Sequence, residues 1–414
     1  MTQPGHSRTQ RLAQHLVRPV DAATRARARL HLLDWLGCVA GARRSPAAAA
    51  VAGLGGAPMR RAAFLGNVLE MDDVHRTALL HPGPVTWPVA LECADVGTMD
   101  DVLAAAVRGY EAMIAVGATF DAHHYAHYHP TATSGVFGAA ACRASSATRD
   151  VAVLAHALAL AGSVSGGVWQ TRHSHNLAKQ WHVIHAVETG RSAADHALSG
   201  VTGPLDVLEG EQGIYAATCH APKPLVLGTA WRIGEVSFKP WGACRHAHPA
   251  IDAALQLREA GALGGDILVE SYRDALTFCD RPHPNTPLEA KFSLQHAVAV
   301  VTERGAPQLG DFEPDAIVAL AEARARVEVR EAAEITARYP SHFGARLVAG
   351  GQTVELIDTL GDPERPLARD GVIAKARTLM AWGGLSEANV ETGVWLALDG
   401  TDPATLVRWL TEVV

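Results

Sequence analysis

Apolar residues recur every three or four positions along most of the first 230 residues, the spacing that places side chains on one face of a helix. The pattern predicts helices from Asp21 to Ala40 and from about Leu177 to Leu198. Another is predicted to begin after Asp150, a residue type that caps helices, with one apolar face formed by Val151, Leu154, Leu158 and Ala161. Little of this region alternates as a strand does.

The pattern changes after Val236, where apolar and polar residues begin to alternate. Alternation predicts strands at 267–272, 325–330, 345–349 and 352–356, and Gly350-Gly351 between the last two is a hairpin signal. Helices return at the end, where Asp402-Pro403 supplies an N-cap and a first-turn proline. We therefore predict a mainly α protein, with a large all-helical domain formed by both chain ends (1–235 and 367–414) and a smaller α+β lid domain (236–366).

Composition and charge narrow the class of protein. The chain has 414 residues, of which 48% are hydrophobic and 19% charged, and this is the composition of a globular protein with a substantial core. Its net charge of −7 argues against nucleic acid as a partner. The N-terminal stretch Met1–Arg11 is polar and the longest apolar runs are too short to cross a bilayer, so we expect no leader, no membrane partner and a cytoplasmic location.

Several cofactor signatures are missing from the sequence. None of the six cysteines is spaced as C-x-x-C, which argues against an iron–sulfur cluster and a structural zinc. Neither a phosphate-binding G-x-x-x-x-G-K-[ST] loop nor an H-E-x-x-H zinc motif occurs. Gly162–Gly166 also lacks the central serine of a nucleophile elbow. Nucleotide-dependent and serine-hydrolase chemistry are therefore disfavoured.

Histidine is abundant, with 21 residues, and four of them directly precede proline: His81, His129, His248 and His283. Random placement would give roughly one such pair. Because proline favours the first helical position, the preceding histidine often lies at the N-cap, where the helix dipole keeps the ring neutral and the free amides attract an anion. Polar loop residues that happen to precede proline are an equally good interpretation of any one pair.

Three further groups of residues are candidates for chemistry. Around His129, the hydroxyl of Thr131 and nearby amides suit a carboxylate, whereas His123, His124 and His127 upstream form a possible metal cluster or a solvated loop. The stretch from Glu70 to His81 holds three carboxylates and two imidazoles, a set that can transfer protons, bind a cation or cap helices. Lys179 and His182 lie one helical turn apart, facing one pocket or the solvent.

The last candidate segment, Phe238–Pro249, lies at the boundary between the helical and mixed regions, where clefts form. Its basic residues would make a cationic wall suited to a polycarboxylate: Lys239, Arg245, His246 and His248. Cys244 has the spacing of a metal ligand with His246 and His248, but no fourth ligand is evident, so a neutral pocket residue is the preferred interpretation.

Taken in order, these segments resemble the 2-methylcitrate dehydratase (MmgE/PrpD) family, whose members include cis-aconitate decarboxylase and iminodisuccinate epimerase. The resemblance covers nearly the whole chain and rests on seven short segments: Leu33–Cys38, Asp72 to Gly83, Gly109–Glu111, His129–Thr133, Lys179 with His182, Lys239 to His248, and Lys291–Gln295. It implies an all-helical large domain, a smaller lid, a homodimer formed through the helical domain, and no cofactor or metal.

The resemblance also implies a site. His81, His129, Lys179 and Lys239 fall on the family's proton-transfer positions, and we expect them to line one pocket between the helical domain and the lid. Substrate contacts are expected from Glu70, Asp73, Val74, Thr131, His182, Cys244, Arg245, His246 and His296. This chain departs from the family at several of these positions: Glu70 replaces an aspartate, Val74 a threonine, His296 an aromatic residue and Cys244 the histidine of the decarboxylase. Decarboxylation of cis-aconitate is therefore disfavoured, and the pocket is expected to differ from that for 2-methylcitrate.

The expected chemistry is removal of a proton next to a carboxylate, which builds an enolate-like anion that cations must stabilise. The leading prediction is a lyase that eliminates water from a small hydroxy-di- or tricarboxylic acid. Return of the proton to the other face would instead make the protein an epimerase. A catalytically silent carboxylate-binding relative and, more remotely, a metal-dependent hydrolase are the alternatives of other classes.

Overall fold

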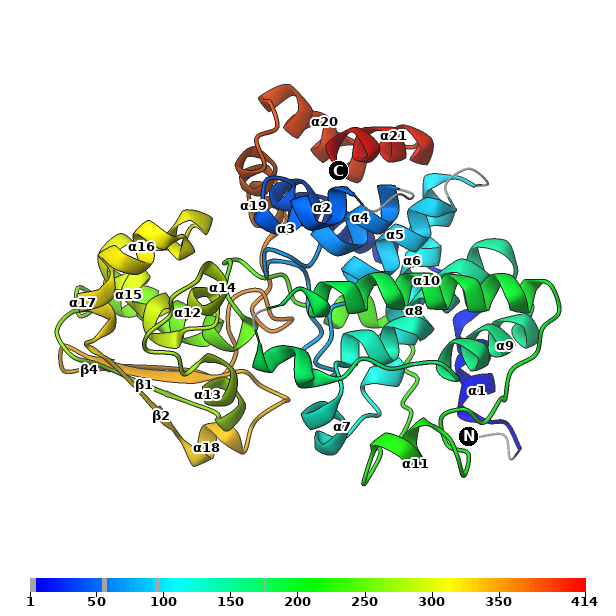
Figure 1. Ribbon diagram of the computed structural model, residues 1–414, viewed down its shortest axis with the longest axis horizontal. Coiled ribbons are helices and arrows are strands. Elements are labelled where there is room, and N and C mark those ends of the chain that lie inside the picture. The colour runs from blue at the N-terminus through cyan, green and yellow to red at the C-terminus, as the bar shows by residue number, and fades with distance from the viewer. Residues whose placement is uncertain (1–4, 54–57, 94–96, 175) are drawn as a thin grey trace. The chain divides into compact units, whose positions relative to one another are not determined.

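A computed structural model describes residues 5–53, 58–93, 97–174 and 176–414, so the polar stretch Met1–Arg11 is described only from Gly5 onward. The contacts divide the chain into two compact units (Figure 1). Unit 1 combines Met1–Val236 with Arg369–Val414, and unit 2 is Ser237–Ala368. Unit 1 is helical and unit 2 combines helices with a sheet, which confirms the predicted mainly α class with a smaller α+β region.

Unit 1 consists of helices from both ends of the chain. They are α1 (Arg8–Leu16), α2 (Ala22–Ala42), α3 (Pro46–Ala52), α4 (Pro58–Leu65), α5 (Gly83–Glu92), α6 (Met99–Gly117), α7 (Ala122–His127), α8 (Pro130–Ala147), α9 (Val151–Gly162), α10 (Ala178–Leu198), α11 (Ile214–Thr218), α19 (Arg369–Trp382), α20 (Glu387–Leu398) and α21 (Pro403–Val413), with short 3-10 turns at Trp169–His173 and Arg232–Glu235. The predicted caps are present, because Asp21, Asp150 and Asp402 each accept hydrogen bonds from the first turn of the helix that follows.

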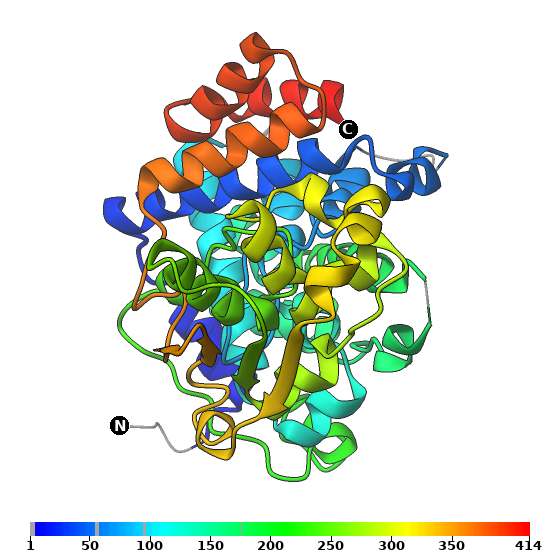
Figure 2. The same cartoon turned by 90° about the vertical axis from the view of Figure 1, so that its left-hand side faces the viewer.

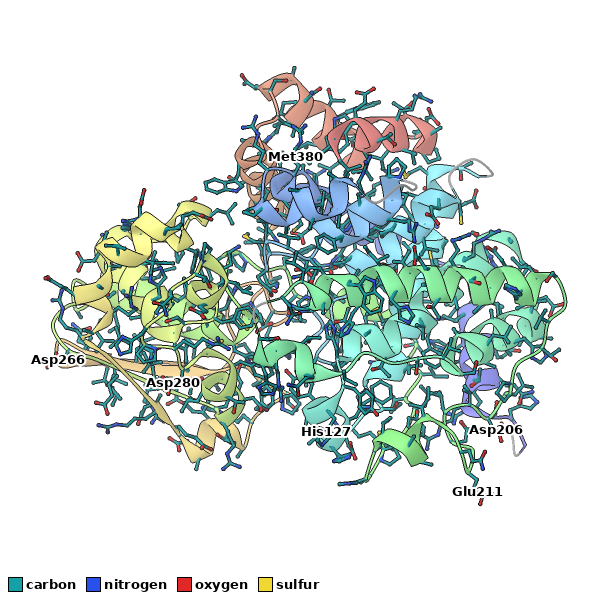
Figure 3. The ribbon with its side chains drawn as sticks, viewed as in Figure 1. His127, Asp206, Glu211, Asp266, Asp280 and Met380 are labelled. Carbon is teal, nitrogen blue, oxygen red and sulfur yellow. The ribbon has the colours of Figure 1, made fainter. Side chains whose placement is uncertain are left out.

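Helix α8 lies at the centre of unit 1, packed against α6, α9 and α10. It is almost entirely buried, and small residues allow the close approach. A β-carbon on Gly138 would lie 2.8 Å from that of Met113 in α6, and one on Gly190 of α10 would lie 2.8 Å from the backbone nitrogen of Ala140. The returning helix α19 packs along α2, and Met380, labelled in Figure 3, is fully buried on it.

Unit 2 has a four-stranded sheet in the order β2-β1-β3-β4, formed by β1 (Ile267–Ser271), β2 (Val327–Glu331), β3 (Ala345–Ala349) and β4 (Gln352–Leu356). β1 pairs parallel with β2 and antiparallel with β3. β3 and β4 form the predicted hairpin, whose Gly350 and Gly351 have φ of 54° and 74°, a conformation that glycine adopts without strain.

Helices complete unit 2. They are α12 (His248–Glu259), α13 (Arg273–Cys279), α14 (Pro287–Lys291), α15 (Leu294–Arg304), α16 (Pro314–Ala319), α17 (Ala321–Arg324) and α18 (Ala333–Thr336), with 3-10 turns at Arg245–Ala247 and Leu309–Phe312. α12 and α15 pack together and cover one face of the sheet, as Figures 1 and 2 show. The core between them is apolar and includes Ile251, Val269, Val298 and Leu347.

Candidate active site

The loop between α4 and α5 carries most of the acidic candidates together with His81. Two of its non-glycine residues, Glu70 and Leu79, have positive φ of 58° and 55°, conformations that cost about 1–3 kcal/mol each and cluster at functional sites. His75 and Leu80 exchange backbone hydrogen bonds of 2.9 and 3.4 Å, which closes the end of the loop just before His81. The loop is therefore held in one conformation by its own backbone.

Glu70 forms a short ion pair with Lys179, which lies in the first turn of α10. The Glu70 side chain is 3% exposed and that of Lys179 is 19% exposed. The structure thus brings two predicted site residues together, and it places a cation at the surface of the loop with its counter-charge buried beneath it.

His129 and His182 form a second contact, with their Nδ1 atoms 3.2 Å apart. The ring of His129 also lies against that of Trp169, with a centroid separation of 4.4 Å. Burial first, and then the charges of Lys179, His182 and His81, hold the pKa of His129 well below its usual range. Burial likewise lowers the pKa of His182. Both rings are therefore neutral near pH 7, one donating and the other accepting the shared hydrogen.

His81 is tied to this cluster through backbone and side chain. Its backbone N–H donates to the hydroxyl of Thr131 at 3.1 Å, which joins the loop to the first turn of α8. Its Nδ1 lies 2.8 Å from Oδ2 of Asp72, and the amide of Asn67 donates to the same oxygen at 2.7 Å. His81, His129, Thr131, Lys179, His182 and Glu70 thus form one cluster within unit 1.

Asp73 was predicted to contact substrate, but the structure assigns it to the support of the loop. Its Oδ1 accepts from the backbone N–H of Gly83 at 2.9 Å, and its Oδ2 lies 2.7 Å from both the Tyr110 hydroxyl and Nδ1 of His31. Burial raises the pKa of Asp73 to about 6, and burial lowers that of His31 well below its usual range. Both oxygens of Asp73 thus serve protein donors, and its contact with substrate stays a prediction.

The returning helix α19 fixes the loop from another side. Lys375 donates to the backbone carbonyl of Met71 and pairs with Asp34 of α2, each at 2.5 Å. Burial alone would lower the pKa of Lys375, but the Asp34 carboxylate outweighs it and the pKa is raised. A residue more than 300 positions from the loop therefore helps to hold it.

In unit 2, three residues of the predicted cationic wall have partners within the unit: Arg245, His246 and His248. Arg245 is buried and forms an ion pair with Asp362, so its charge is compensated within the unit. Arg245 also donates to Nδ1 of His248 at 3.2 Å, and Nε2 of His248 lies 3.1 Å from the carbonyl of Ala243. Both nitrogens of His248 are thus engaged by the protein, and a contact of Arg245 or His248 with substrate stays a prediction.

His246 belongs to an aromatic cluster in unit 2. Its ring is stacked between those of Phe278 and Phe343, with interplanar angles of 11° and 9°, and its Nδ1 lies 2.7 Å from the Tyr272 hydroxyl. Burial lowers the pKa of His246 to about 3, so the ring carries no charge near pH 7. These contacts stabilise the core of unit 2, and substrate binding by His246 stays a prediction.

His296 is also a core residue. Its Nε2 lies 2.8 Å from the carbonyl of Asp311, and Arg324 donates to its Nδ1 at 3.2 Å. Burial lowers its pKa to about 4. Both nitrogens of His296 thus have protein partners, and its contact with substrate stays a prediction.

Lys239, Cys244 and Val74 remain as predictions. Lys239 is fully buried and Cys244 nearly so, with the Cys244 backbone N–H donating to the Lys291 carbonyl at 2.8 Å. Val74 is buried in the loop of unit 1. Since Lys239 belongs to unit 2, its sharing of a pocket with His81, His129 and Lys179 stays a prediction.

The four His-Pro pairs behave differently from one another. Only His129 occupies an N-cap, and its side chain does not bond the helix it precedes, which leaves the ring for His182. His81 lies one residue before the N-cap of α5, and His248 is already inside α12. His283 precedes no helix. Of the four histidines that precede proline, His129 alone therefore lies at the helix N-cap where the sequence pattern predicted it.

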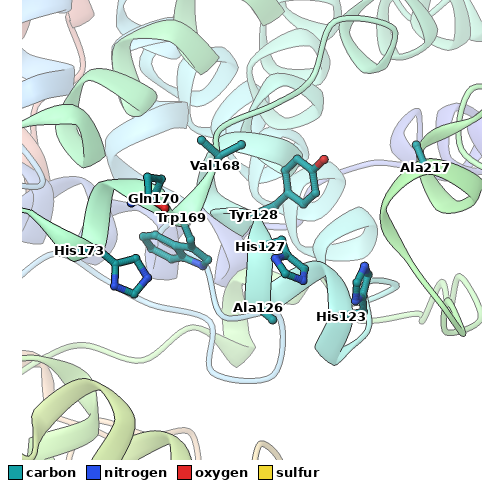
Figure 4. A pocket seen from close by; sticks show the side chains of 9 residues that line it. All are labelled: His123, Ala126, His127, Tyr128, Val168, Trp169, Gln170, His173 and Ala217. Atoms are coloured by element: carbon teal, nitrogen blue, oxygen red, sulfur yellow. The ribbon is translucent and has the colours of Figure 1, made fainter.

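Two of the histidines before His129 lie along a cleft of about 410 Å³ (Figure 4), whose lining includes His123, His127, Trp169 and His173. The ring of His123 is stacked on that of His220 with centroids 3.7 Å apart. His124 is buried and bonded to the Thr218 hydroxyl at 2.8 Å. In the part of the chain that the structure describes, no group of three or more His, Cys, Asp or Glu residues is arranged to hold a metal ion.

Sequence reasoning missed Asp72, Asn67, His31 and Lys375 as parts of the site. Asp72 stood in the doublet Asp72-Asp73, and nothing in the sequence says which member faces His81.

Among the described residues, no helix is both long and apolar enough to cross a bilayer.

Comparison with known proteins agrees with the order of motifs. The MmgE/PrpD N-terminal domain matches residues 57–226, and the MmgE/PrpD C-terminal domain matches residues 241–394. Human cis-aconitate decarboxylase is 24% identical over 277 residues, which cover 60% of this chain and 56% of the human protein. The chain thus spans little more than half the length of that relative. Because the two domain models match most of the chain, in order and without overlap, the protein belongs to the MmgE/PrpD family.

Proposed function

We propose that this protein is a lyase that eliminates water from a small hydroxy-di- or tricarboxylic acid by way of a carbanion. The observation that carries the proposal is the cluster in unit 1, where Lys179 stands beside the neutral imidazoles of His129 and His182 and near His81. Membership of a family that contains dehydratases and decarboxylases supports the same class of chemistry.

The first step is removal of the α-proton of the substrate. The C–H bond breaks, the proton passes to Nε2 of His81, and the electron pair delocalises into the neighbouring carboxylate. The 2.8 Å contact with the Asp72 carboxylate stabilises the imidazolium that forms. Lys179 faces the developing charge of the enolate, and Lys239 is the second cation of the proposed step.

The second step is departure of the hydroxyl group. The C–O bond breaks, His129 gives a proton to the leaving oxygen, and the products are water and an unsaturated acid. His129 is held neutral in the protein alone, so it must gain this proton together with the substrate, whose negative charge offsets burial and the charge of Lys179.

Unit 1 also carries features that support the expected homodimer. The exposed apolar side chains on this unit include Val164, Trp181 and Val201, with exposed fractions of 59%, 56% and 43%. Val164 and Val201 line the same surface hollow, and adjoining exposed apolar side chains favour contact with another protein, for which we propose a second copy.

The experiment that tests the activity is proton NMR in heavy water with a panel of di- and tricarboxylates. We expect loss of the α-proton signal together with the vinyl signals of an unsaturated product. Deuterium at the α-carbon without elimination would replace the lyase by an epimerase, and loss of carbon dioxide would replace it by a decarboxylase. A panel with no exchange at all would leave the carboxylate-binding relative as the function.

A further inference from the structure

His129 and His182 share a hydrogen bond between their Nδ1 atoms, which lie 3.2 Å apart. His129 stands at the N-cap of α8, where its backbone N–H donates to the carbonyl of Gly167 at 2.8 Å, and His182 lies in the second turn of α10. A β-carbon on Gly167 would lie 3.5 Å from Nδ1 of His182, so the same glycine packs against the second ring. The hydrogen bond thus joins two rings whose main chains are held in place.

A hydrogen bond between two Nδ1 atoms gives the two imidazoles opposite tautomers. Burial lowers the pKa of both residues, so both rings are neutral near pH 7, and a neutral imidazole carries one N–H group. The ring that donates has its hydrogen on Nδ1 and a lone pair on Nε2. The ring that accepts has a lone pair on Nδ1 and carries its hydrogen on Nε2. The pair therefore presents one donor and one acceptor at its two Nε2 atoms.

The proposed elimination indicates which ring donates. His129 gives a proton to the leaving hydroxyl, and because its Nδ1 is bonded to His182, this proton leaves from Nε2. His129 is then the accepting ring and His182 the donating ring. Among the described residues, Nε2 of His182 has no hydrogen-bond partner, and the ring lies 6.1 Å from that of Trp181, which is 56% exposed. The lone pair of His182 is thus left for a proton that comes from solvent.

We propose that His182 is a positioning residue for elimination, which resupplies His129 with the proton that the leaving hydroxyl takes. A solvent proton binds the lone pair on Nε2 of His182, while the Nδ1–H bond of His182 breaks and its proton binds Nδ1 of His129. His182 stays neutral, and His129 becomes an imidazolium beside the negatively charged substrate. The Nε2–H bond of His129 then breaks as the proton moves to the departing oxygen, which leaves as water.

The starting tautomers return after the product has left. A solvent proton binds Nε2 of His129, the shared hydrogen moves back to Nδ1 of His182, and Nε2 of His182 gives its proton to solvent. The net result of a turnover is that one solvent proton has been delivered to the hydroxyl group. The transfer itself rests on the proposed function, whereas the opposite tautomers do not depend on any activity.

The tautomers are measured by ¹⁵N NMR of the full-length protein labelled in its histidine rings, at about pH 8 so that ordinary histidines are neutral. His129→Gln and His182→Asn identify the two sets of signals by their disappearance. We expect hydrogen on Nδ1 of His182 and on Nε2 of His129. The reverse arrangement, or the same tautomer in both rings, would overturn the proposal.

The transfer is tested by comparing elimination with α-deuterium exchange in His182→Asn. The new amide lies near the former position of Nδ1 and can still bond His129, but it does not pass a proton from solvent. Because His81 takes the α-proton, elimination should fall more than exchange, and we expect their ratio to drop by about a hundredfold, as when a general acid is lost. An equal fall of both rates would show that His182 only supports the site, and would overturn the proposal.

A matched control separates proton transfer from the loss of any imidazole on α10. His185→Asn makes the same change one turn further along the helix, in a ring that stacks on Trp181 and is not bonded to His129. It should leave the ratio of elimination to exchange unchanged. The same drop in His185→Asn as in His182→Asn would contradict a role that belongs to the bonded ring.

The outcomes also distinguish this inference from the proposed function. The expected tautomers, combined with neither exchange nor elimination on any carboxylate, would refute the lyase and leave the description of the hydrogen-bonded pair intact. Elimination by the unaltered protein, combined with an unchanged ratio in folded His182→Asn, would retain the lyase and refute the transfer through His182.

Discussion

Replacing Lys179 by methionine tests whether its charge serves the substrate or only the protein. Glu70 is 3% exposed and paired with Lys179, so Lys179→Met leaves a buried carboxylate without its cation, at a cost of about 3–5 kcal/mol in the free energy of unfolding. Loss of a cation that faces developing negative charge should also lower the exchange rate by about a hundredfold or more, or about 3 kcal/mol in the barrier. Stability and activity are thus expected to fall together in the single variant.

The double variant Lys179→Met/Glu70→Gln separates the two effects. It removes both charges, so most of the lost free energy of unfolding should return, and urea unfolding measures this. The rate of α-deuterium exchange should stay low, because no cation has been restored. Recovery of exchange in the double variant would refute the reasoning, since Lys179 would then be needed only to neutralise Glu70.

Further expectations concern metal, charge, pH and assembly. EDTA should leave the exchange rate unchanged and His123→Ala should alter it little, whereas an essential metal would make both abolish it. Lys239→Met should nearly abolish exchange, and Lys239→Arg should be poorly tolerated, because a planar fork replaces a point charge. Burial lowers the pKa of His296 to about 4, so its contribution to stability is complete above its unfolded pKa of about 6.5 and is lost as the pH falls towards 4. We therefore expect the free energy of unfolding, measured with urea, to fall between pH 7 and pH 5.5 by about 1 kcal/mol less in His296→Gln than in the unaltered protein. An equal fall in both proteins would contradict this linkage. Light scattering should report a dimer, and a monomer at working concentration would count against the proposed assembly.

The elements of the fold were largely predictable because their signals are local. The three- and four-residue spacing after Asp150 and the alternation around Gly350 depend only on neighbouring residues, and α9 and the β3–β4 hairpin formed where expected. In the site, the pairing of Lys179 with Glu70 was reachable only through family resemblance, because 109 positions separate them.

Three predicted substrate contacts have protein partners that the sequence does not show. Arg245 and His246 were predicted as part of a cationic wall and His296 through the family resemblance, and each has a partner inside unit 2. Arg245 is neutralised by Asp362, which lies 117 positions later, and His246 lost its charge to burial between two phenylalanines. A sequence shows where charges stand along the chain but not which distant residue compensates them.

The same burial constrains the substrate that the proposed chemistry can use. Burial and Lys179 keep His129 neutral, so the protein alone offers a poor proton donor to a leaving hydroxyl. Negative charge brought into the cluster changes this balance, because it offsets Lys179 and raises the pKa of the neighbouring imidazoles. The single charge of a monocarboxylate only offsets that of Lys179. A substrate with a second carboxylate has further negative charge, which favours protonation of His129. The arrangement of one lysine beside two neutral histidines therefore favours di- and tricarboxylates over monocarboxylates. The negative charge of such a substrate allows His129 to take up the proton that it later gives to the leaving hydroxyl group.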